Sequence, residues 1–155
     1  MSPDLERRLK AAHPELLRCL REKGSRAMIG DFGIACGGGW FSIIDELRSA
    51  LELTVVAGGP QPIAAQITQE AGRLRFNVVG VPAISQPDVD ALITAAQEQS
   101  ATACEVCGAP AVLRWQRGVQ TVCDLHASPG ARVVQDGDFE RIRAEREVRR
   151  QNRVT

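Results

Sequence analysis

The spacing of apolar residues near the start of the chain predicts helices. Residues 3–23 carry leucines three and four positions apart, the spacing that places side chains on one helix face. Pro14 interrupts this run, so we expect a break near His13 and a second short helix after it. A further helix is expected over 40–53, with an inward stripe formed by Phe41, Ile44, Leu47 and Leu51.

The pattern changes to strand-like in the middle of the chain. Two extended segments, 63–69 and 73–80, flank the short sequence Glu70-Ala71-Gly72 and predict a β-hairpin. In the second segment polar and apolar residues alternate, as in a half-buried strand. Its apolar positions are Leu74, Phe76 and Val78, and its polar positions are Arg73, Arg75 and Asn77.

Two further elements follow from local signals. Ser85 is a suitable N-cap for a helix over 86–103, whose apolar stripe is Val89, Leu92, Ile93 and Ala96. Residues 26–36 predict a strand weakened by its glycines, and Gly37–Gly39 predict a sharp, mobile turn. Together the elements predict an α+β fold with N-terminal helices and a small antiparallel sheet with packed helices.

Four residues near the C-terminal end have the spacing of a metal site. Cys104 and Cys107 are followed after fifteen residues by Cys123 and His126, giving C-x2-C-x15-C-x2-H. The spacer reads as two short strands around Arg117-Gly118, and such a hairpin would return the second pair to the first. Gly108 permits the positive φ that metal knuckles use.

We interpret this pattern as one structural Zn²⁺ per chain, held in a zinc-ribbon or treble-clef-like module. Three thiolates and one imidazole complete a tetrahedral site and leave no open position for water. Two other interpretations are open. The cysteines are ordinary buried thiols, or the first pair is a redox pair, although no helix is expected to start from it.

Composition and charge place few limits on function. The 155 residues include 19 basic and 19 acidic side chains, so no strong overall field attracts nucleic acid or membrane. We find neither a signal peptide nor an apolar run of about 20 residues, and expect a cytoplasmic protein.

The expected domains are an α+β part at 1–100, a zinc-ribbon module at 101–130 and a polar, Arg-rich helix or tail at 131–155.

No catalytic set is expected from the sequence. Cys36 has no histidine near it in sequence and reads as a buried or idle thiol. His13 reads as a helix-boundary residue, and Asp45 and Glu46 point to different parts of a helix surface. We therefore predict a protein that is not an enzyme.

Aromatic and arginine side chains provide the candidate contacts to a partner. They are Trp40, Arg73, Arg75, Arg114, Trp115 and Arg117. Arginine beside an aromatic ring is suited to stacking on a base and binding phosphate. In the tail, acidic residues alternate with the arginines and favour a salt-bridged helix instead.

Three segments in this order resemble a group of small bacterial and phage-borne proteins of unassigned function. The segments are "GGGWFSIIDEL", "QITQEAGRLRFNV" and "CEVCGAP…TVCDLHA", which together span roughly 37–127. The matching residues are the four ligands with Trp40, Phe41, Gly72, Leu74, Arg75 and Phe76. Residues 68–71 and Asn77 depart from the family pattern. The resemblance implies a fold and a zinc site, and suggests association with mobile elements.

Two functional hypotheses follow. The first is a non-catalytic, zinc-stabilised binding protein that acts on a protein partner, as immunity proteins and phage inhibitors do, in a 1:1 or a homodimeric 2:2 complex. The alternative is a nucleic-acid-binding ribbon that uses Arg114, Trp115, Arg117 and the tail, with an affinity that falls steeply with salt. A redox thiol protein is a third hypothesis.

Overall fold

The computed structural model describes residues 1–17, 34–54, 61–116, 118–135 and 137–138. Within these ranges it confirms the α+β class, with α-helices and two small antiparallel sheets. The helices are α1 (Pro3–Ala12), α3 (Phe41–Leu53) and α4 (Gln86–Ser100). The strands are β1 (Ile63–Glu70), β2 (Arg73–Val79), β3 (Val112–Trp115), β4 (Val119–Val122) and β5 (Arg132–Val133).

The β1–β2 hairpin is formed as predicted. Ala71 and Gly72 make its turn, and both have positive φ, as the mirror-image turns of tight hairpins require. Leu74 and Phe76 of β2 are buried, whereas Arg73 and the other arginine of the strand are exposed. The alternation in the sequence therefore assigned the two faces of this strand correctly.

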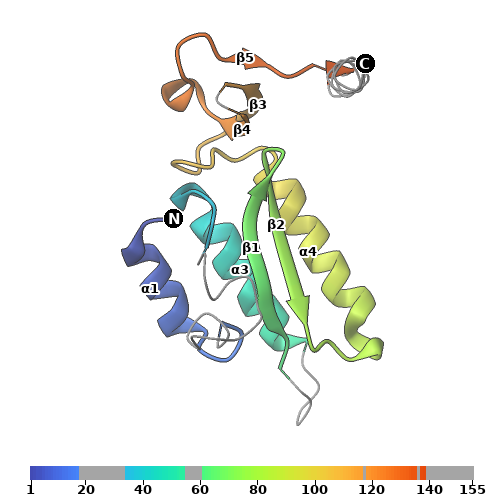
Figure 1. The fold of residues 1–155 in the computed structure, drawn as a ribbon. Helices are drawn as coiled ribbons and strands as arrows, with labels where there is room; N and C mark the ends of the chain where they lie inside the picture. The colour runs from blue at the N-terminus through green and yellow to red at the C-terminus, as the bar shows by residue number, and fades with distance from the viewer. Residues whose placement is uncertain (18–33, 55–60, 117, 136, 139–155) are drawn as a thin grey trace, which may run out of the picture.

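Helices α3 and α4 contact each other, and α4 also contacts β2. Figure 1 shows α1 beside α3, with the hairpin and α4 completing one body and β3–β5 lying beyond the hairpin turn. Side chains from all these helices and both hairpin strands form one apolar core. Its largest fully buried members are Trp40, Phe76, Leu9, Leu16, Leu17, Ile44, Leu51, Ile67, Leu74 and Val89.

A buried arginine joins α1 to α3. Arg48 has no exposed surface, and its guanidinium donates hydrogen bonds to the Leu9 carbonyl at 3.2 Å and the His13 carbonyl at 3.3 Å. Each carbonyl also accepts one backbone hydrogen bond, from His13 N and from Leu17 N, and carbonyls at a helix C-terminus carry partial negative charge, so a cation here is favourable. Burial lowers the pKa of Arg48 to about 10, although Glu52 raises it. The side chain therefore stays charged at neutral pH.

His13 takes part in the same contact. It is the C-cap of α1, which confirms the predicted helix boundary, and its ring lies between two carboxylates of α3. Nδ1 lies 2.8 Å from Glu52 Oε1, and Nε2 lies 3.2 Å from Asp45 Oδ1. A ring that carries protons on both nitrogens can donate to both carboxylates. The C-terminal end of α1 is thus held to α3 both by Arg48 and by the His13 ring.

Several expectations differ from the structure or fall outside its described part. Helix α4 ends at Ser100 rather than at 103, and Ser85 precedes it without a side-chain capping bond. The short strand β5 was not expected. The second N-terminal helix beyond residue 17, most of the strand over 26–36 and the tail from 139 lie outside the described residues.

The Arg48 contacts lead to a stability prediction. In Arg48→Met the Leu9 and His13 carbonyls each lose one of two donors and the acidic groups of α3 lose a cation, so we expect a loss of about 2 kcal/mol in unfolding free energy. Urea unfolding followed by tryptophan fluorescence measures this. Arg7→Met is the control, because Arg7 and its partner Asp4 are largely exposed and the change should stay within about 0.5 kcal/mol. Equal effects of the two substitutions would contradict the assignment.

Candidate metal centre

The first ligand pair lies on a tight turn between α4 and β3, the knuckle at residues 103–108. Gly108 N donates to the Cys104 carbonyl at 2.8 Å, and Cys104 N donates to the Ala109 carbonyl at 2.7 Å. Gly108 has φ of +79°, as its position after the second cysteine predicted. This backbone turns the side chains of Cys104 and Cys107 toward the same point.

The second ligand pair arrives on the predicted hairpin. Strands β3 and β4 pair antiparallel, with Val112 opposite Val122, so the chain returns to the first knuckle directly before Cys123. A 3₁₀ turn over Asp124–His126 then brings His126 back toward the same point. The short β5 pairs with the other edge of β3 and extends this sheet to three strands.

The four ligand atoms form a compact cluster, all within 4.8 Å of one another. Cys107 Sγ lies 3.8 Å from Cys123 Sγ, and His126 Nδ1 lies 3.2 Å from Cys123 Sγ and 3.7 Å from Cys104 Sγ. A tetrahedral ion with sulfur ligands at ~2.3 Å and nitrogen at ~2.0 Å separates them by about 3.5–3.8 Å. The sulfurs are too far apart for a disulfide, whose S–S bond is ~2.05 Å. The cluster can therefore hold one metal ion.

The surroundings of the thiols favour anionic sulfur at Cys104. Burial raises the pKa of this thiol, but the backbone N–H groups of Cys123, Cys107 and Val106 outweigh burial and lower it to about 6. At Cys107 the Ala109 N–H lowers the pKa, whereas desolvation and the neighbouring thiols raise it, and the net shift is upward. Neighbouring thiols disfavour one another's ionisation, and a bound cation would remove this repulsion between the thiolates.

A glycine-rich segment packs against the back of the first knuckle. Gly39 N donates to the Glu105 carbonyl at 2.8 Å, and a Cβ on Gly39 would lie 2.2 Å from the Cys104 carbonyl oxygen and 2.6 Å from Cys107 N. A Cβ on Gly37 would lie 2.1 Å from the Glu105 carbonyl oxygen. Residues 37–39 were expected to form a mobile turn, and this is wrong. At Gly37 and Gly39 the loop that carries the first two cysteines occupies the space of a side chain.

Trp40 follows this segment and is fully buried. Its indole Nε1 donates to the Ala103 carbonyl at 2.8 Å, which ties the start of α3 to the start of the knuckle. A side chain with no exposed surface has nothing to offer a partner, so Trp40 does not belong among the partner-binding residues. A tryptophan at a helix start has the same local pattern whether it faces the core or the solvent.

Glu105, inside the first ligand pair, was missed by the sequence analysis. It is buried, and its Oε1 accepts a hydrogen bond from Gly37 N at 3.0 Å, whereas Oε2 has no partner among the described residues. Burial raises the pKa of this carboxyl, although the Gly37 N–H and the Met1 ammonium lower it. Glu105 joins the knuckle to the glycine segment through this hydrogen bond. The spacing of the cysteines gives no sign of a contact with a segment so far away in the sequence.

The β1–β2 hairpin turn makes a second contact with the metal module, the part of the chain at 103–135 that carries the ligand cluster and strands β3–β5. Thr121 Oγ1 donates to the Gly72 carbonyl at 2.7 Å, and Gln69 Nε2 donates to the Val119 carbonyl at 2.6 Å. A Cβ on Gly72 would lie 2.1 Å from Leu113 Cδ1. The turn of β1–β2 is therefore packed against strands β3 and β4, across the predicted boundary at residue 100.

The remaining partner-binding candidates lie in different places. Arg73 and Arg75 are exposed on β2, where Arg75 pairs with Glu70. Arg114 is mostly covered, because its guanidinium binds Asp124 and the Val122 carbonyl. Trp115 is half-buried on β3, and Arg117 lies outside the described residues.

Cys36 has the environment of an unreactive thiol. Burial raises its pKa to about 12, an effect that nearby Glu105 reinforces and the Met1 ammonium opposes. The free anion is the nucleophilic form of cysteine, and it is scarce at neutral pH at such a site. The interpretation of Cys36 as a buried thiol is confirmed, and Cys19 lies outside the described residues.

Comparison with known proteins gives no match. No family model, no curated protein and no solved structure is significantly similar to the chain. Among the helices in the described part of the chain, none has the length and apolar character needed to cross a bilayer.

The glycine packing leads to a second prediction. Gly39→Ala places a methyl group against backbone atoms of the knuckle, which cannot move without disturbing the ligands, so we expect a loss of about 3 kcal/mol or more. Chemical unfolding gives this loss, and elemental analysis gives the metal content. Gly118→Ala is the matched control, since a Cβ there meets nothing within 4 Å and the change should stay within about 0.5 kcal/mol. Full stability of Gly39→Ala would mean that the knuckle is not packed here.

Proposed function

We propose that the cluster binds one Zn²⁺ in a structural role. Three cysteines and a histidine match the preference of this borderline-soft ion, and the spacing of the ligand atoms fits its tetrahedral geometry. Four protein ligands fill the coordination sphere, so a bound ion would contribute folding free energy rather than activate water. The contacts from Gly37–Trp40 and from Gly72 would carry this stabilisation into the α+β part.

We further propose that the metal module binds a protein partner. The observation that carries this proposal is the exposure of one apolar side chain inside each ligand pair. Leu125, between Cys123 and His126, is 91% exposed, and Val106, between the first two ligands, is 51% exposed. The ligands turn inward to the cluster, and Glu105 beside them is buried, whereas Val106 and Leu125 are exposed to the solvent. Apolar groups held rigidly at a surface suit an apolar hollow on a partner.

The surroundings of the candidate nucleophile support a non-catalytic role. Cys36 is buried with a raised pKa, and both ring nitrogens of His13 already face carboxylates. The resemblance to phage-borne proteins adds a role to this proposal, as an immunity protein or an inhibitor that covers its target. A cytoplasmic location and a 1:1 or 2:2 complex belong to the same proposal.

Nucleic acid remains the alternative partner. It requires cations free to neutralise phosphates, but Arg114 is held by Asp124, and Arg132 of the module contacts Asp138 at 3.4 Å. Arg132 keeps half of its side chain exposed, so the described part of the module offers one accessible arginine and no cationic track for a nucleic-acid backbone. The absence of such a track among these residues places the protein-binding hypothesis first.

The zinc proposal predicts one zinc per chain by elemental analysis of protein purified without added metal. Cys123→Ser should lose the metal and unfold at a lower temperature, because three ligands remain around an incomplete site. Cys36→Ser is the control and should keep full zinc content, since Cys36 lies outside the cluster. A metal-free wild-type protein with a reversible disulfide would instead favour the redox hypothesis.

The protein-binding proposal predicts that a glutamate at Leu125 prevents capture of the partner. Tagged wild-type protein, Leu125→Glu and Ile84→Glu are compared in pull-downs from the source cells, with quantification by mass spectrometry. We expect Leu125→Glu to reduce the recovered partner about tenfold or more, as at the centre of an interface. Ile84 is 83% exposed outside the metal module, so Ile84→Glu controls for the loss of an exposed apolar group.

The zinc content of Leu125→Glu and Ile84→Glu is measured first. A variant that keeps its zinc is folded around the cluster, so a loss of partner is then due to the changed surface. The proposal fails if wild-type protein enriches no partner, or if Leu125→Glu recovers the same partner in the same amount. Recovery that disappears on nuclease treatment would favour the nucleic-acid alternative.

A further inference from the structure

A cavity of about 380 Å³ lies beside the three-stranded sheet of the metal module. Its size is within the range of small-ligand pockets, ~300–1,000 Å³. The four metal ligands do not line it. The proposed partner-binding residues Leu125 and Val106 do not line it either. Its lining residues are Trp115, Gln116, Ser128, Pro129, Gly130, Ala131 and Arg132.

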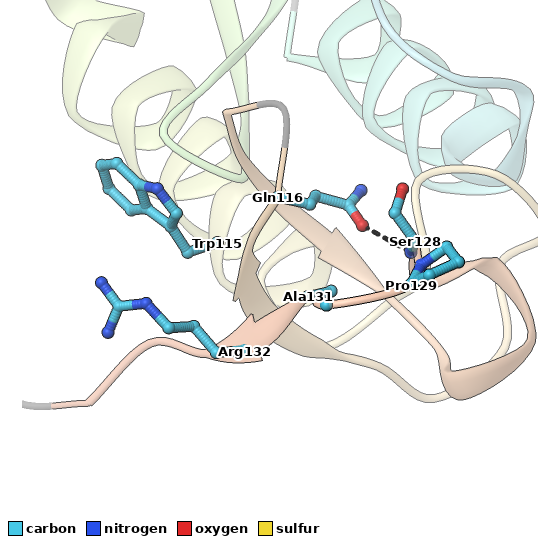
Figure 2. A pocket seen from close by; sticks show the side chains of 7 residues that line it. Trp115, Gln116, Ser128, Pro129, Ala131 and Arg132 are labelled. Carbon is cyan, nitrogen blue, oxygen red and sulfur yellow. Dashed lines mark hydrogen bonds between the residues drawn. The ribbon is translucent and has the colours of Figure 1, made fainter.

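One wall of the cavity combines an aromatic ring with a cation. Trp115 of β3 and Arg132 of β5 are opposite each other in the antiparallel register, so their side chains share one face of the sheet. Figure 2 shows both side chains projecting in the same direction from their strands. The guanidinium carbon lies 6.0 Å from the centre of the ring, at the outer limit of a cation–π contact. The ring and the charge are therefore presented together.

The cavity is also lined by a turn of fixed shape. Ala131 N donates to the Ser128 carbonyl at 2.9 Å, with Pro129 and Gly130 at the central positions and φ of +81° at Gly130, the features of a type II turn. Ser128 N donates to Gln116 Oε1 at 2.9 Å, the bond drawn in Figure 2. The Gln116 side chain thus holds the turn against β3. The turn and the strands that line the cavity are therefore joined to each other.

The guanidinium of Arg132 is accessible to an anion. Half of the side-chain surface is exposed, and the contact of Nη1 with Asp138 Oδ2, at 3.4 Å, is long for a charge-assisted hydrogen bond. A phosphate offers oxygens that match the planar guanidinium two at a time. It can therefore compete for Arg132, although Asp138 is buried and keeps its bond from Gln135 N.

We propose that this cavity binds a nucleotide, with the base stacked on Trp115 and a phosphate on Arg132. Base–aromatic stacking contributes ~1–3 kcal/mol, and one arginine–phosphate pair adds to it. The nearest arginine along β3, Arg114, is bound to Asp124 and does not extend a cationic track. The site therefore suits one nucleotide, either free or within a single strand. It is independent of the protein contact proposed through Leu125.

The two tryptophans of the chain make binding measurable. Trp40 is fully buried, so a ligand in this cavity acts on the fluorescence of Trp115. The zinc-loaded full chain is titrated with adenosine and uridine monophosphates and with a short single-stranded oligonucleotide, at low and high salt. We expect saturable quenching. Binding by the monophosphates identifies a free nucleotide as the ligand source, and binding by the oligonucleotide in their place identifies a single strand.

Two variants test the two halves of the site. Arg132→Gln should weaken binding about tenfold, the value of one charge-assisted hydrogen-bond pair. Trp115→Leu removes the reporter, so its binding is measured by calorimetry and should be lost. Arg7→Gln should bind as wild type, because the Arg7 side chain is largely exposed on α1 and does not line the cavity. Thermal unfolding confirms that each variant is folded.

The proposal is overturned if neither the monophosphates nor the oligonucleotide quench Trp115 up to millimolar concentration. It is also overturned if Arg132→Gln binds as tightly as wild type. Quenching by a short peptide with acidic and aromatic residues, but by neither type of nucleotide ligand, would assign the cavity to a polypeptide instead.

Discussion

The contact between the Gly37–Trp40 backbone and the loop at 103–108 determines how the two parts of the protein are joined. Gly39 and Gly37 both approach carbonyl oxygens of the knuckle so closely that neither position has room for a Cβ. The Trp40 indole and the Glu105 carboxylate close the contact with hydrogen bonds from either side. Because the first two ligands lie on that same loop, the geometry of the cluster and the start of α3 depend on each other.

The sequence predicts those parts of the structure in which the contacting residues lie close together along the chain. The ligands Cys104, Cys107, Cys123 and His126 converge because each pair is held by its own turn and the hairpin between them is short. The β1–β2 hairpin follows from alternation over seven residues and a turn that tolerates positive φ. In both cases the elements that meet are neighbours along the chain, so periodicity and spacing suffice.

Features that depend on distant segments could not be predicted in this way. A run of three glycines has the same sequence whether it forms a mobile turn or receives another backbone, and the second case holds here. Arg48 occupies the inward stripe of α3 with no sign in its neighbours that α1 supplies carbonyls to it. Likewise the alignment of Trp115 with Arg132 exists because β5, a strand of two residues, pairs with β3.

The contacts of the glycine segment also differ from those of the cluster in the length of chain that they close. Gly37 and Trp40 reach partners 68 and 63 residues away, whereas Cys104 and His126 are separated by 22. Closing the longer loop costs about 1 kcal/mol more in chain entropy. The knuckle is thus the less costly closure. The local turn gives the loop at 103–108 its shape, and the residues before α3 pack against a loop that is already ordered by its own hydrogen bonds.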